Sequence, residues 1–306
     1  MDASSMTNQP VKETTLPLTL LNRGKVRDIY AIGEDKLLIV TTDRLSAFDV
    51  VLPDPIPQKG RVLNQTALFW FKRLEGIVPN HIITDDIHQM GLDPELLEKH
   101  AAQIEGRSIL VKRCKPLPIE CVVRGYITGS GWKDYEKTGK VCGHTLPEGL
   151  QQCQKLPQTL FTPSTKAEQG LHDENISIDQ AKELIGAELT QKVLDLSISI
   201  YEEGDKFANE KGIMIADTKF EFGLLNDELV LIDEVLTPDS SRFWPKAKYE
   251  VGRDQDSFDK QIVRNYLQES GWAKTPPGPV LPKDVIAQTS QAYIDVYERL
   301  TGQALN

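Results

Sequence analysis

The stretch from Asp217 to Arg242 constrains the fold most, because it sets acidic and basic side chains into apolar, strand-like sequence. Side chains of a β-strand point alternately to its two faces. Within Ile213 to Phe222, one face is mostly apolar, whereas the other turns ionic halfway along, at Asp217, Lys219 and Glu221. This pattern predicts a strand that packs on a core and contributes the far end of its second face to a polar cleft.

A hairpin is predicted next, because the turn-forming pair Asn226-Asp227 precedes the apolar run Leu229 to Ile232. The length of its loop decides which side chains meet. A three-residue loop places Glu221 opposite Asp233, with the two Cβ atoms roughly 5 Å apart. A two-residue loop places Glu221 opposite Ile232 and Asp233 on the other face. The sequence leaves both loops open.

The carboxylates of Glu221 and Asp233 indicate a cation, because two acids at that separation repel each other. Carboxylate oxygens without Cys or His partners suit magnesium and a bound polyphosphate. The three-residue loop therefore predicts a shared Mg²⁺ site. The alternative is a solvated or salt-bridged hairpin in which Lys219 supplies the counter-charge.

Length and charge narrow the class of protein. With 306 residues, 40% of them hydrophobic, the chain can bury a sizeable core and form two lobes. Its 45 acidic and 35 basic residues give a net charge of -10 without a basic block, which argues against nucleic acid as a partner. The 4 cysteines have neither a Cys-x-x-Cys pair nor zinc spacing, which favours reduced thiols in a cytoplasmic protein. No apolar run approaches the ~20 residues that cross a bilayer, so no membrane partner is expected.

The chain is expected to have three parts. Residues 1–15 are polar and predict a flexible tail, residues 16–117 form an N-terminal lobe, and residues 118–306 form a larger lobe that includes the C-terminal helices. The boundary falls at Lys115 to Pro118, where two prolines interrupt a ladder and suit a crossing between lobes.

Local signals predict further elements. Short β-rich runs at Val26 to Ala31, Leu37 to Thr41 and Ile109 to Arg113 predict strands. Helices are expected where a capping residue meets an apolar period of 3.6 residues. These are Asn64 to Leu74, Asp93-Pro94 to Gln103, a helix with the capping box Ser177 and Gln180, Glu188 to Lys211, and a final helix capped by Asp284.

Two other segments have the residue types of an anion site. Arg23 to Arg27 combines a glycine with basic side chains, so a backbone amide and Lys25 could hold phosphate oxygens; the alternative is an exposed basic turn. Small residues after Val123 let the backbone approach a ligand, and Arg124 with Ser130 could bind a phosphate or carboxylate; the alternative is a tight structural turn. The chain has neither a P-loop nor a Gly-x-Gly-x-x-Gly motif.

Several motifs occur in one order along the chain. They are Gly24-Lys25-Val26-Arg27-Asp28, Asp43-Arg44-Leu45-Ser46-Ala47-Phe48-Asp49, Val123-Arg124-Gly125-Tyr126-Ile127-Thr128-Gly129-Ser130, Phe161-Thr162-Pro163-Ser164-Thr165-Lys166, Asp217-Thr218-Lys219-Phe220-Glu221-Phe222-Gly223, and Asp233-Glu234 through Arg242. With these motifs the chain closely resembles the SAICAR synthetase (phosphoribosylaminoimidazole-succinocarboxamide synthase) family, from about Leu20 to the final helix. This chain has a long loop from Cys142 to Ile176, and in this it resembles the longer, fungal type of the family.

The resemblance implies an α+β fold, with an antiparallel-sheet N-terminal ATP lobe and a larger mixed α/β lobe in a two-lobe, ATP-grasp or kinase-like architecture. It implies a ligase of de novo purine biosynthesis, in which ATP, carboxyaminoimidazole ribonucleotide (CAIR) and L-aspartate give SAICAR, ADP and phosphate. It also implies a monomer.

The resemblance implies roles for individual residues as well. Lys219 and Lys25 are expected to be catalytic. The expected ATP ligands are Gly24, Lys25, Val26, Arg27, Lys112, Cys114, Glu221 and Asp233, of which Glu221 and Asp233 also hold Mg²⁺. The expected CAIR ligands are Arg124, Ser130, Asp239 and Arg242, and the candidates for the aspartate pocket are Lys166 and His172.

The reaction needs activation, because a carboxylate has too poor a leaving group to react with an amine in neutral water. The hypothesis is that the CAIR carboxylate attacks the γ-phosphoryl group, and that the aspartate amine then displaces phosphate from the acyl phosphate. Magnesium and Lys25 or Lys219 would offset charge on the phosphoryl oxygens. A small-molecule kinase and a non-catalytic nucleotide-binding regulator are the alternatives.

Overall fold

The computed structural model describes residues 9–166, 174–258 and 260–305. The chain forms two compact units, and each is described by itself. Unit 1 comprises Met1–Phe69, His81–Cys114 and Asp259–Asn306, and unit 2 comprises Trp70–Asn80 and Lys115–Phe258. One of the passages between the units lies between Cys114 and Lys115, next to the proline-containing segment Lys115 to Pro118.

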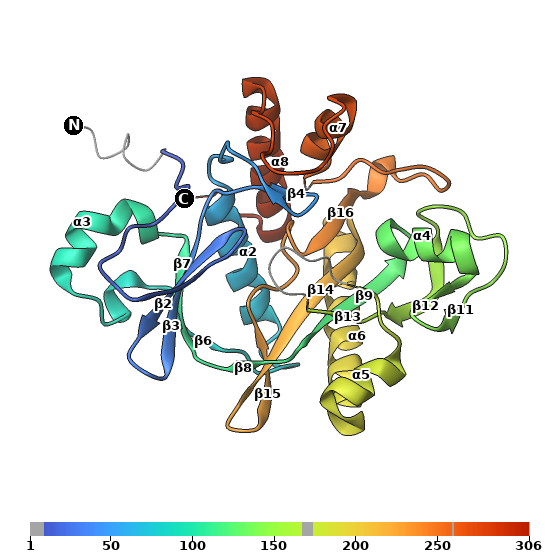
Figure 1. The fold of residues 1–306 in the computed structure, drawn as a ribbon, viewed down its shortest axis with the longest axis horizontal. Helices are drawn as coiled ribbons and strands as arrows, with labels where there is room; N and C mark the ends of the chain where they lie inside the picture. Colours follow the sequence, from blue (N-terminus) through green and yellow to red (C-terminus); the bar gives the residue numbers. More distant parts are fainter. Residues whose placement is uncertain (1–8, 167–173, 259, 306) are drawn as a thin grey trace. The chain divides into compact units, whose positions relative to one another are not determined.

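Unit 1 is built on an antiparallel five-stranded sheet (Figure 1). Its strand order is β1 (Leu20–Arg23), β2 (Arg27–Ile32), β3 (Lys36–Thr41), β7 (Ser108–Lys112) and β6 (Ile82–Thr84). Strand alternation divides the apolar side chains between two cores. Leu38 and Val40 pack with Leu96 and Ile104 of α3 (Pro94–Ile104), whereas Ile39 packs with residues that include Leu68 of α2 (Lys59–Arg73).

The C-terminal helices α7 (Gln261–Glu269) and α8 (Lys283–Thr301) belong to unit 1, not to the larger lobe in which the sequence analysis placed them. Val263, Leu267 and Leu281 are buried together with Leu45 and Leu52, next to the short strands β4 (Ser46–Ala47) and β5 (Val50–Val51). The apolar period of a helix shows that one face is buried, but it does not identify the surface that covers that face.

The last part of the predicted flexible tail is held in place. Thr14 is 1% exposed, and both its backbone N–H and its hydroxyl donate to the carboxylate of Asp28. Leu16 is buried in the core with Tyr30. The prediction of a flexible tail from polar composition is therefore wrong for Thr14, because its N–H and hydroxyl are the hydrogen-bond partners of a buried acid.

Unit 2 is built on a seven-stranded antiparallel sheet. The central strands are β12 (Lys155–Phe161), β9 (Ile119–Tyr126), β14 (Ile213–Leu225) and β15 (Glu228–Ile232), and β8 (Lys115–Pro116), β13 (Ser164–Thr165) and β16 (Ser241–Pro245) pair with them. The long helix α6 (Ala187–Glu210) lies against β14, where the Tyr201 hydroxyl donates to the carbonyl of Ile215 over 2.6 Å. The smaller elements of unit 2 are α4 (Gly129–Thr138), β10 (Lys140–Val141), β11 (His144–Thr145) and α5 (Ile178–Ile185).

Several local predictions are confirmed. Asp93 caps α3 through the backbone N–H of Glu95, and Ser177 with Gln180 forms the capping box of α5. Two helix starts are wrong. Helix α2 begins at Lys59, before the predicted Asn64, and Pro282 rather than Asp284 precedes α8.

The loop of the β14–β15 hairpin has two residues, so the three-residue loop of the Mg²⁺ hypothesis does not occur. Glu221 lies opposite Ile232, and Leu225 lies opposite Glu228. The turn residues Asn226 and Asp227 have φ values of 50° and 66°, as in the type I′ turn that matches the twist of paired strands. Glu221 and Asp233 are therefore not a cross-strand pair.

This turn gives a prediction about stability. Asp227→Gly is expected to raise the free energy of unfolding by about 0.5 kcal/mol, because glycine adopts a positive φ without steric cost. The relief of this steric cost exceeds the larger backbone entropy that glycine, compared with aspartate, loses on folding. Urea unfolding measures the change. Asp179→Gly, the same substitution in the first turn of α5, is the control and should destabilise by about 0.5–1 kcal/mol. Equal losses for both variants would contradict the turn assignment.

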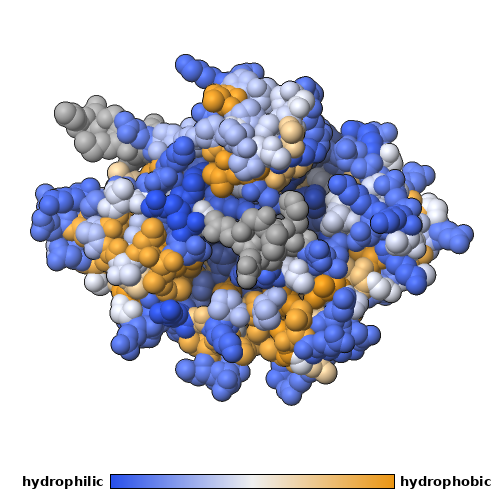
Figure 2. Space-filling view, in the orientation of Figure 1, coloured by the Kyte–Doolittle hydropathy of each residue, from blue (hydrophilic) through white to orange (hydrophobic). Residues whose placement is uncertain are grey.

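The face of the molecule shown in Figure 2 is mostly hydrophilic, in agreement with the net charge of -10. Apolar residues gather on the left of this view, where Figure 1 places β2 and β3. The exposed large apolar side chains include Leu20, Leu21 and Ile83 on the edge strands β1 and β6. Among the described residues, no helix is both long and apolar enough to span a membrane.

Candidate active site

Two arginines share one buried carboxylate on the sheet of unit 2. Arg124 of β9 lies directly opposite Asp217 of β14, and Arg124 Nη1 donates to Asp217 Oδ2 over 2.8 Å. The two side chains are only 4% and 6% exposed. Arg242 of β16 binds the same Asp217 oxygen and is 33% exposed. Two guanidinium groups on one carboxylate leave a local charge of +1, which favours an anionic ligand.

The other nitrogens of Arg124 are also bound. Nε donates to Thr162 Oγ1 over 3.0 Å, and Nη2 donates to Ser130 Oγ over 2.9 Å. Burial lowers the pKa of Arg124, and Asp217 opposes that shift. The guanidinium is still charged at neutral pH, because its ordinary pKa is above about 12. The side chain is thus fixed before any ligand binds.

The glycines of this segment make room for the two arginines. A Cβ atom on Gly129 would lie 2.6 Å from Arg242 Nη2, and one on Gly131 would lie 3.1 Å from Arg124 Cδ. Small residues were expected here so that the backbone could approach a ligand, and they also allow this close approach of side chains. Gly129 and Ser130 form the start of α4, where the helix dipole adds to the positive potential.

The predicted nucleotide ligand Asp239 lies in the turn that leads to Arg242. The Asp239 N–H donates to Thr237 Oγ1 over 3.3 Å, and the Ser241 N–H donates to the Thr237 carbonyl over 2.9 Å. Ser241 then pairs with Thr218 of β14. The turn and β16 therefore bring Asp239 and Arg242 to the strand that carries Asp217.

Lys219, the next ionic residue of β14, lies among carboxylates. Its Nζ is 2.5 Å from Glu120 Oε1. Burial acts to lower the pKa of Lys219, but Glu120, Glu221 and Glu234 outweigh it, so the pKa is raised. Lys219 therefore keeps its proton at neutral pH and supplies a fixed positive charge, not a general base.

Sequence reasoning missed Glu120 and Thr162, the fixed partners of Lys219 and Arg124. Glu120 has a signal in the sequence, since it is the single acid in the apolar run Ile119 to Val123 and its side chain is 7% exposed. An acid buried in a strand requires a cationic partner. Thr162 has no comparable signal.

The predicted Mg²⁺ site at Glu221 and Asp233 has no cluster of acidic ligands around it in the described part of the chain. No group of three or more His, Cys, Asp or Glu that could hold a metal ion occurs in the described part of the chain. Glu221 Oε2 is bound to Lys166 Nζ. Asp233 follows the end of β15 with a φ of 63°, so strand alternation does not set the direction of its side chain. The residues fit single carboxylate ligands of a nucleotide-bound ion, but not a preformed cage.

Lys166, the described candidate of the aspartate pocket, forms an ion pair with Glu221. The other candidate, His172, lies outside the described residues.

The predicted ATP ligands divide between the units. In unit 1, the β1–β2 turn consists of Gly24, Lys25 and Val26, and Arg27 begins β2. Lys112 ends β7 and Cys114 follows it, whereas Glu221 and Asp233 belong to unit 2. Lys25 Nζ lies 2.5 Å from Asp49 Oδ1, in a pair whose side chains are both 45% exposed. An exposed ion pair of this kind contributes little to stability, so Lys25 can exchange its partner for a phosphate at small cost.

Comparisons with known proteins identify the family of the chain. Residues 20–279 match the model of the SAICAR synthetase family. Phosphoribosylaminoimidazole-succinocarboxamide synthases of Maridesulfovibrio salexigens and Geobacter sulfurreducens are each 56% identical to this chain; the matches cover 98% and 96% of it and 100% and 98% of those proteins. The long form that resembles the fungal type thus also occurs in bacteria.

Solved structures of the same family also resemble this chain. The SAICAR synthase from Saccharomyces cerevisiae complexed with SAICAR has a TM-score of 0.88 and 46% identity, covering 96% of this chain and 99% of its own. A SAICAR synthetase in complex with ADP has a TM-score of 0.67 and 26% identity, covering 93% and 99%.

Proposed function

Since the chain belongs to the SAICAR synthetase family, we propose that it joins L-aspartate to the carboxylate of CAIR as ATP is cleaved to ADP and phosphate, in de novo purine biosynthesis. The match over nearly the full length to synthases of that name is the observation that carries the proposal. The charge of Arg124, Asp217 and Arg242 supports it, because CAIR carries both a phosphate and a carboxylate.

The proposed roles follow the chemistry of each side chain. Arg124 and Arg242 bind an anionic group of CAIR, and Ser130 and Asp239 supply hydrogen bonds to the nucleotide. Lys219 and Lys25 offset the negative charge that develops during phosphoryl transfer. Gly24 to Arg27, Lys112 and Cys114 are proposed to contact ATP, and Lys166 with His172 are proposed to bind aspartate.

In the proposed mechanism, an oxygen of the CAIR carboxylate bonds to the γ-phosphorus as the bond to ADP breaks. The aspartate amine then attacks the acyl carbon, loses a proton and expels inorganic phosphate. No protein nucleophile is needed. Lys219 holds its proton throughout, since its carboxylate neighbours raise its pKa.

An assay of product formation, with ATP, CAIR and aspartate omitted in turn, tests the function. SAICAR should form only with all three substrates. ADP release without aspartate would instead indicate a small-molecule kinase, and no turnover would indicate a nucleotide-binding regulator. Oxygen-18 in the CAIR carboxylate should appear in phosphate, and its full retention in SAICAR would exclude the acyl phosphate.

We propose that Mg²⁺ enters with ATP, because nucleotide-bound magnesium keeps several phosphate and water ligands and needs only one or two carboxylates. Glu221 and Asp233 are proposed as these separate ligands. Glu221→Gln should raise the Mg²⁺ concentration that gives half-maximal rate by about tenfold, the loss of roughly 1.4 kcal/mol of binding. A Mg²⁺ titration of the rate measures this, and an unchanged midpoint would exclude Glu221 as a ligand.

We also propose that the protein is a monomer and acts in the cytoplasm.

A further inference from the structure

The turn from Gly24 to Val26 is held through its backbone carbonyls. Arg44 Nη2 donates to the Gly24 carbonyl over 2.9 Å, and Arg44 Nε donates to the Lys25 carbonyl over 3.4 Å. The Val26 carbonyl accepts from both the backbone N–H and the hydroxyl of Thr42, over 2.9 and 2.6 Å. Three consecutive carbonyls are therefore bound by one short segment, Thr42 to Arg44.

Fixing these carbonyls also fixes the amides. In a trans peptide the N–H points away from the C=O of the same plane. The N–H of Lys25 belongs to the plane of the Gly24 carbonyl, and the N–H of Val26 belongs to that of the Lys25 carbonyl. When Arg44 binds both carbonyls, both N–H groups point away from Arg44, as they do where successive amides form an anion site.

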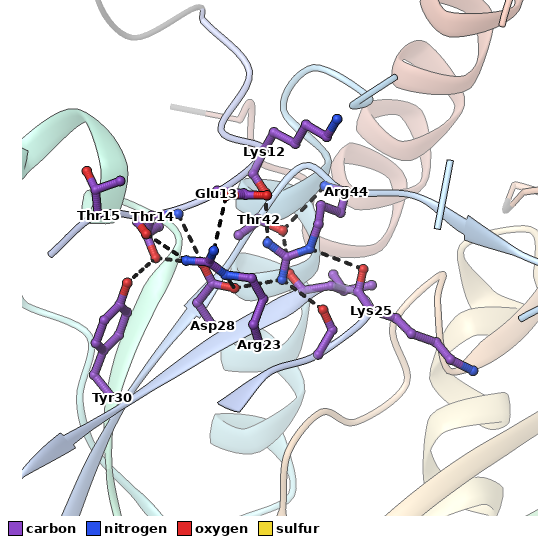
Figure 3. A network of polar contacts seen from close by, with 12 residues as sticks. Lys12, Glu13, Thr14, Thr15, Arg23, Lys25, Asp28, Tyr30, Thr42 and Arg44 are labelled. Carbon is purple, nitrogen blue, oxygen red and sulfur yellow. Dashed lines mark hydrogen bonds and ion pairs between the residues drawn. The ribbon is translucent and has the colours of Figure 1, made fainter. Parts of the chain in front are cut away.

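Arg44 is itself fixed by a buried acid. Its Nη2 lies 2.7 Å from Asp28 Oδ1, and the two side chains are 5% and 0% exposed. Burial acts to raise the pKa of Asp28, but hydrogen bonds from Arg44 and Thr14 outweigh it, so the pKa is lowered and the carboxylate stays charged. Figure 3 shows this network between the turn and the N-terminal segment, with the Lys25 side chain pointing away from it.

The N-terminal segment from Val11 to Thr14 completes the network, and Figure 3 shows its part from Lys12 to Thr14. Thr14 donates to Asp28 Oδ2 from its N–H over 3.0 Å and from its hydroxyl over 2.7 Å. The Lys12 carbonyl accepts from Arg44 Nη1 over 2.7 Å. The Val11 N–H donates to the Asp43 carboxylate, and the Val11 carbonyl accepts from the Asp43 N–H, both over 2.7 Å.

We infer that Arg44 and Thr14 are positioning residues for the ATP-binding turn, and that the segment from Val11 to Thr14 is part of the nucleotide-binding apparatus. The inference rests on the proposed function. Thr14 holds Asp28, Asp28 holds Arg44, and Arg44 sets the direction in which the Lys25 and Val26 amides point. Neither Thr14 nor Arg44 needs to touch the nucleotide.

Thr14→Val tests the inference, because it removes the hydroxyl and keeps the shape of the side chain. The KM for ATP and the Kd for ADP should rise about tenfold, the effect of losing about one hydrogen bond to a charged group, whereas the KM for CAIR stays within about twofold of the native value. Thr14→Ser keeps the hydroxyl, so its KM for ATP and its Kd for ADP should both stay near the native values.

Thr289→Val is the matched control. Thr289 is also fully buried in unit 1, and its hydroxyl donates to the Val285 carbonyl of α8 over 2.7 Å. It should lower Tm about as much as Thr14→Val but leave the KM for ATP unchanged. Equal changes in the KM for ATP in the two variants would show a purely structural role and overturn the inference.

Arg44→Lys gives an independent comparison, since lysine lacks the forked donors that reach two carbonyls. It should raise the KM for ATP further than Thr14→Val does, by about a hundredfold. An ATP KM within twofold of the native value would overturn the inference. The absence of SAICAR formation by the native protein would refute the proposed function instead, and the ADP Kd would still test the positioning.

Discussion

Lys219→Met is expected to lower kcat by about 10²–10³-fold, because a fixed charge that stabilises a developing negative charge contributes that much to the rate. The raised pKa of Lys219 means that its positive charge persists above the ordinary lysine range near about 10.4. The native rate should therefore show no loss from deprotonation of this group below about pH 10. Steady-state kinetics and a pH–rate profile measure both expectations.

A second variant of the ion pair between Lys219 and Glu120 distinguishes an effect on catalysis from an effect on stability. Lys219→Met leaves Glu120, which is 7% exposed, without its bound cation, so the variant should lose about 1–3 kcal/mol of unfolding free energy. Adding Glu120→Gln removes the uncompensated charge and should recover most of that stability. The rate should remain low in the double variant. Recovery of kcat together with Tm would refute a catalytic role for Lys219.

The sequence predicted the strand that carries the site because alternation is a local property. Met214, Phe220 and Phe222 are buried on one face of β14, while Lys219 and Glu221 are partly exposed on the other. Asp217 is buried as well, since Arg124 lies opposite it. The identity of that partner depends on a strand far away in the chain, so alternation alone could not predict it.

The register of the β14–β15 hairpin could not be predicted, because it changes with one residue more or less in the loop. Both loops use the same turn-forming pair, and a shift of one residue moves a side chain to the other face. The structure selects the loop in which Asn226 and Asp227 both take a positive φ. Asn and Asp tolerate this conformation better than other non-glycine residues, so the two-residue turn had a physical basis that composition did not reveal.

Long-range partners explain the other errors. The polar composition of residues 1–15 favours a tail, but Thr14 is the hydrogen-bond donor that the buried Asp28 needs. Similarly, the C-terminal helices were assigned to the wrong lobe, because Val263 and Leu267 of α7 are buried with Leu45 and Leu52, which are distant in sequence. A sequence indicates that a group must be buried or paired, whereas the fold decides with what.

Arg124→Leu is expected to lower kcat/KM for CAIR by about 10³-fold or more, because it removes a buried charge that we propose binds the nucleotide. It should also cost about 3 kcal/mol of stability, since Asp217 stays buried and loses one of two cations. Kinetics with CAIR as the varied substrate and urea unfolding measure these losses.

Loss of stability alone could lower activity, so the double variant Arg124→Leu with Asp217→Leu decides between the two causes. Replacing both partners of a buried pair by apolar residues is often neutral for stability, so unfolding free energy should recover while CAIR turnover does not. Arg107→Leu breaks the buried pair with Asp43 in unit 1, and should lose similar stability without raising the KM for CAIR. If the double variant regains turnover, Arg124 serves only to neutralise Asp217, and the nucleotide must be bound by Arg242 and its neighbours instead.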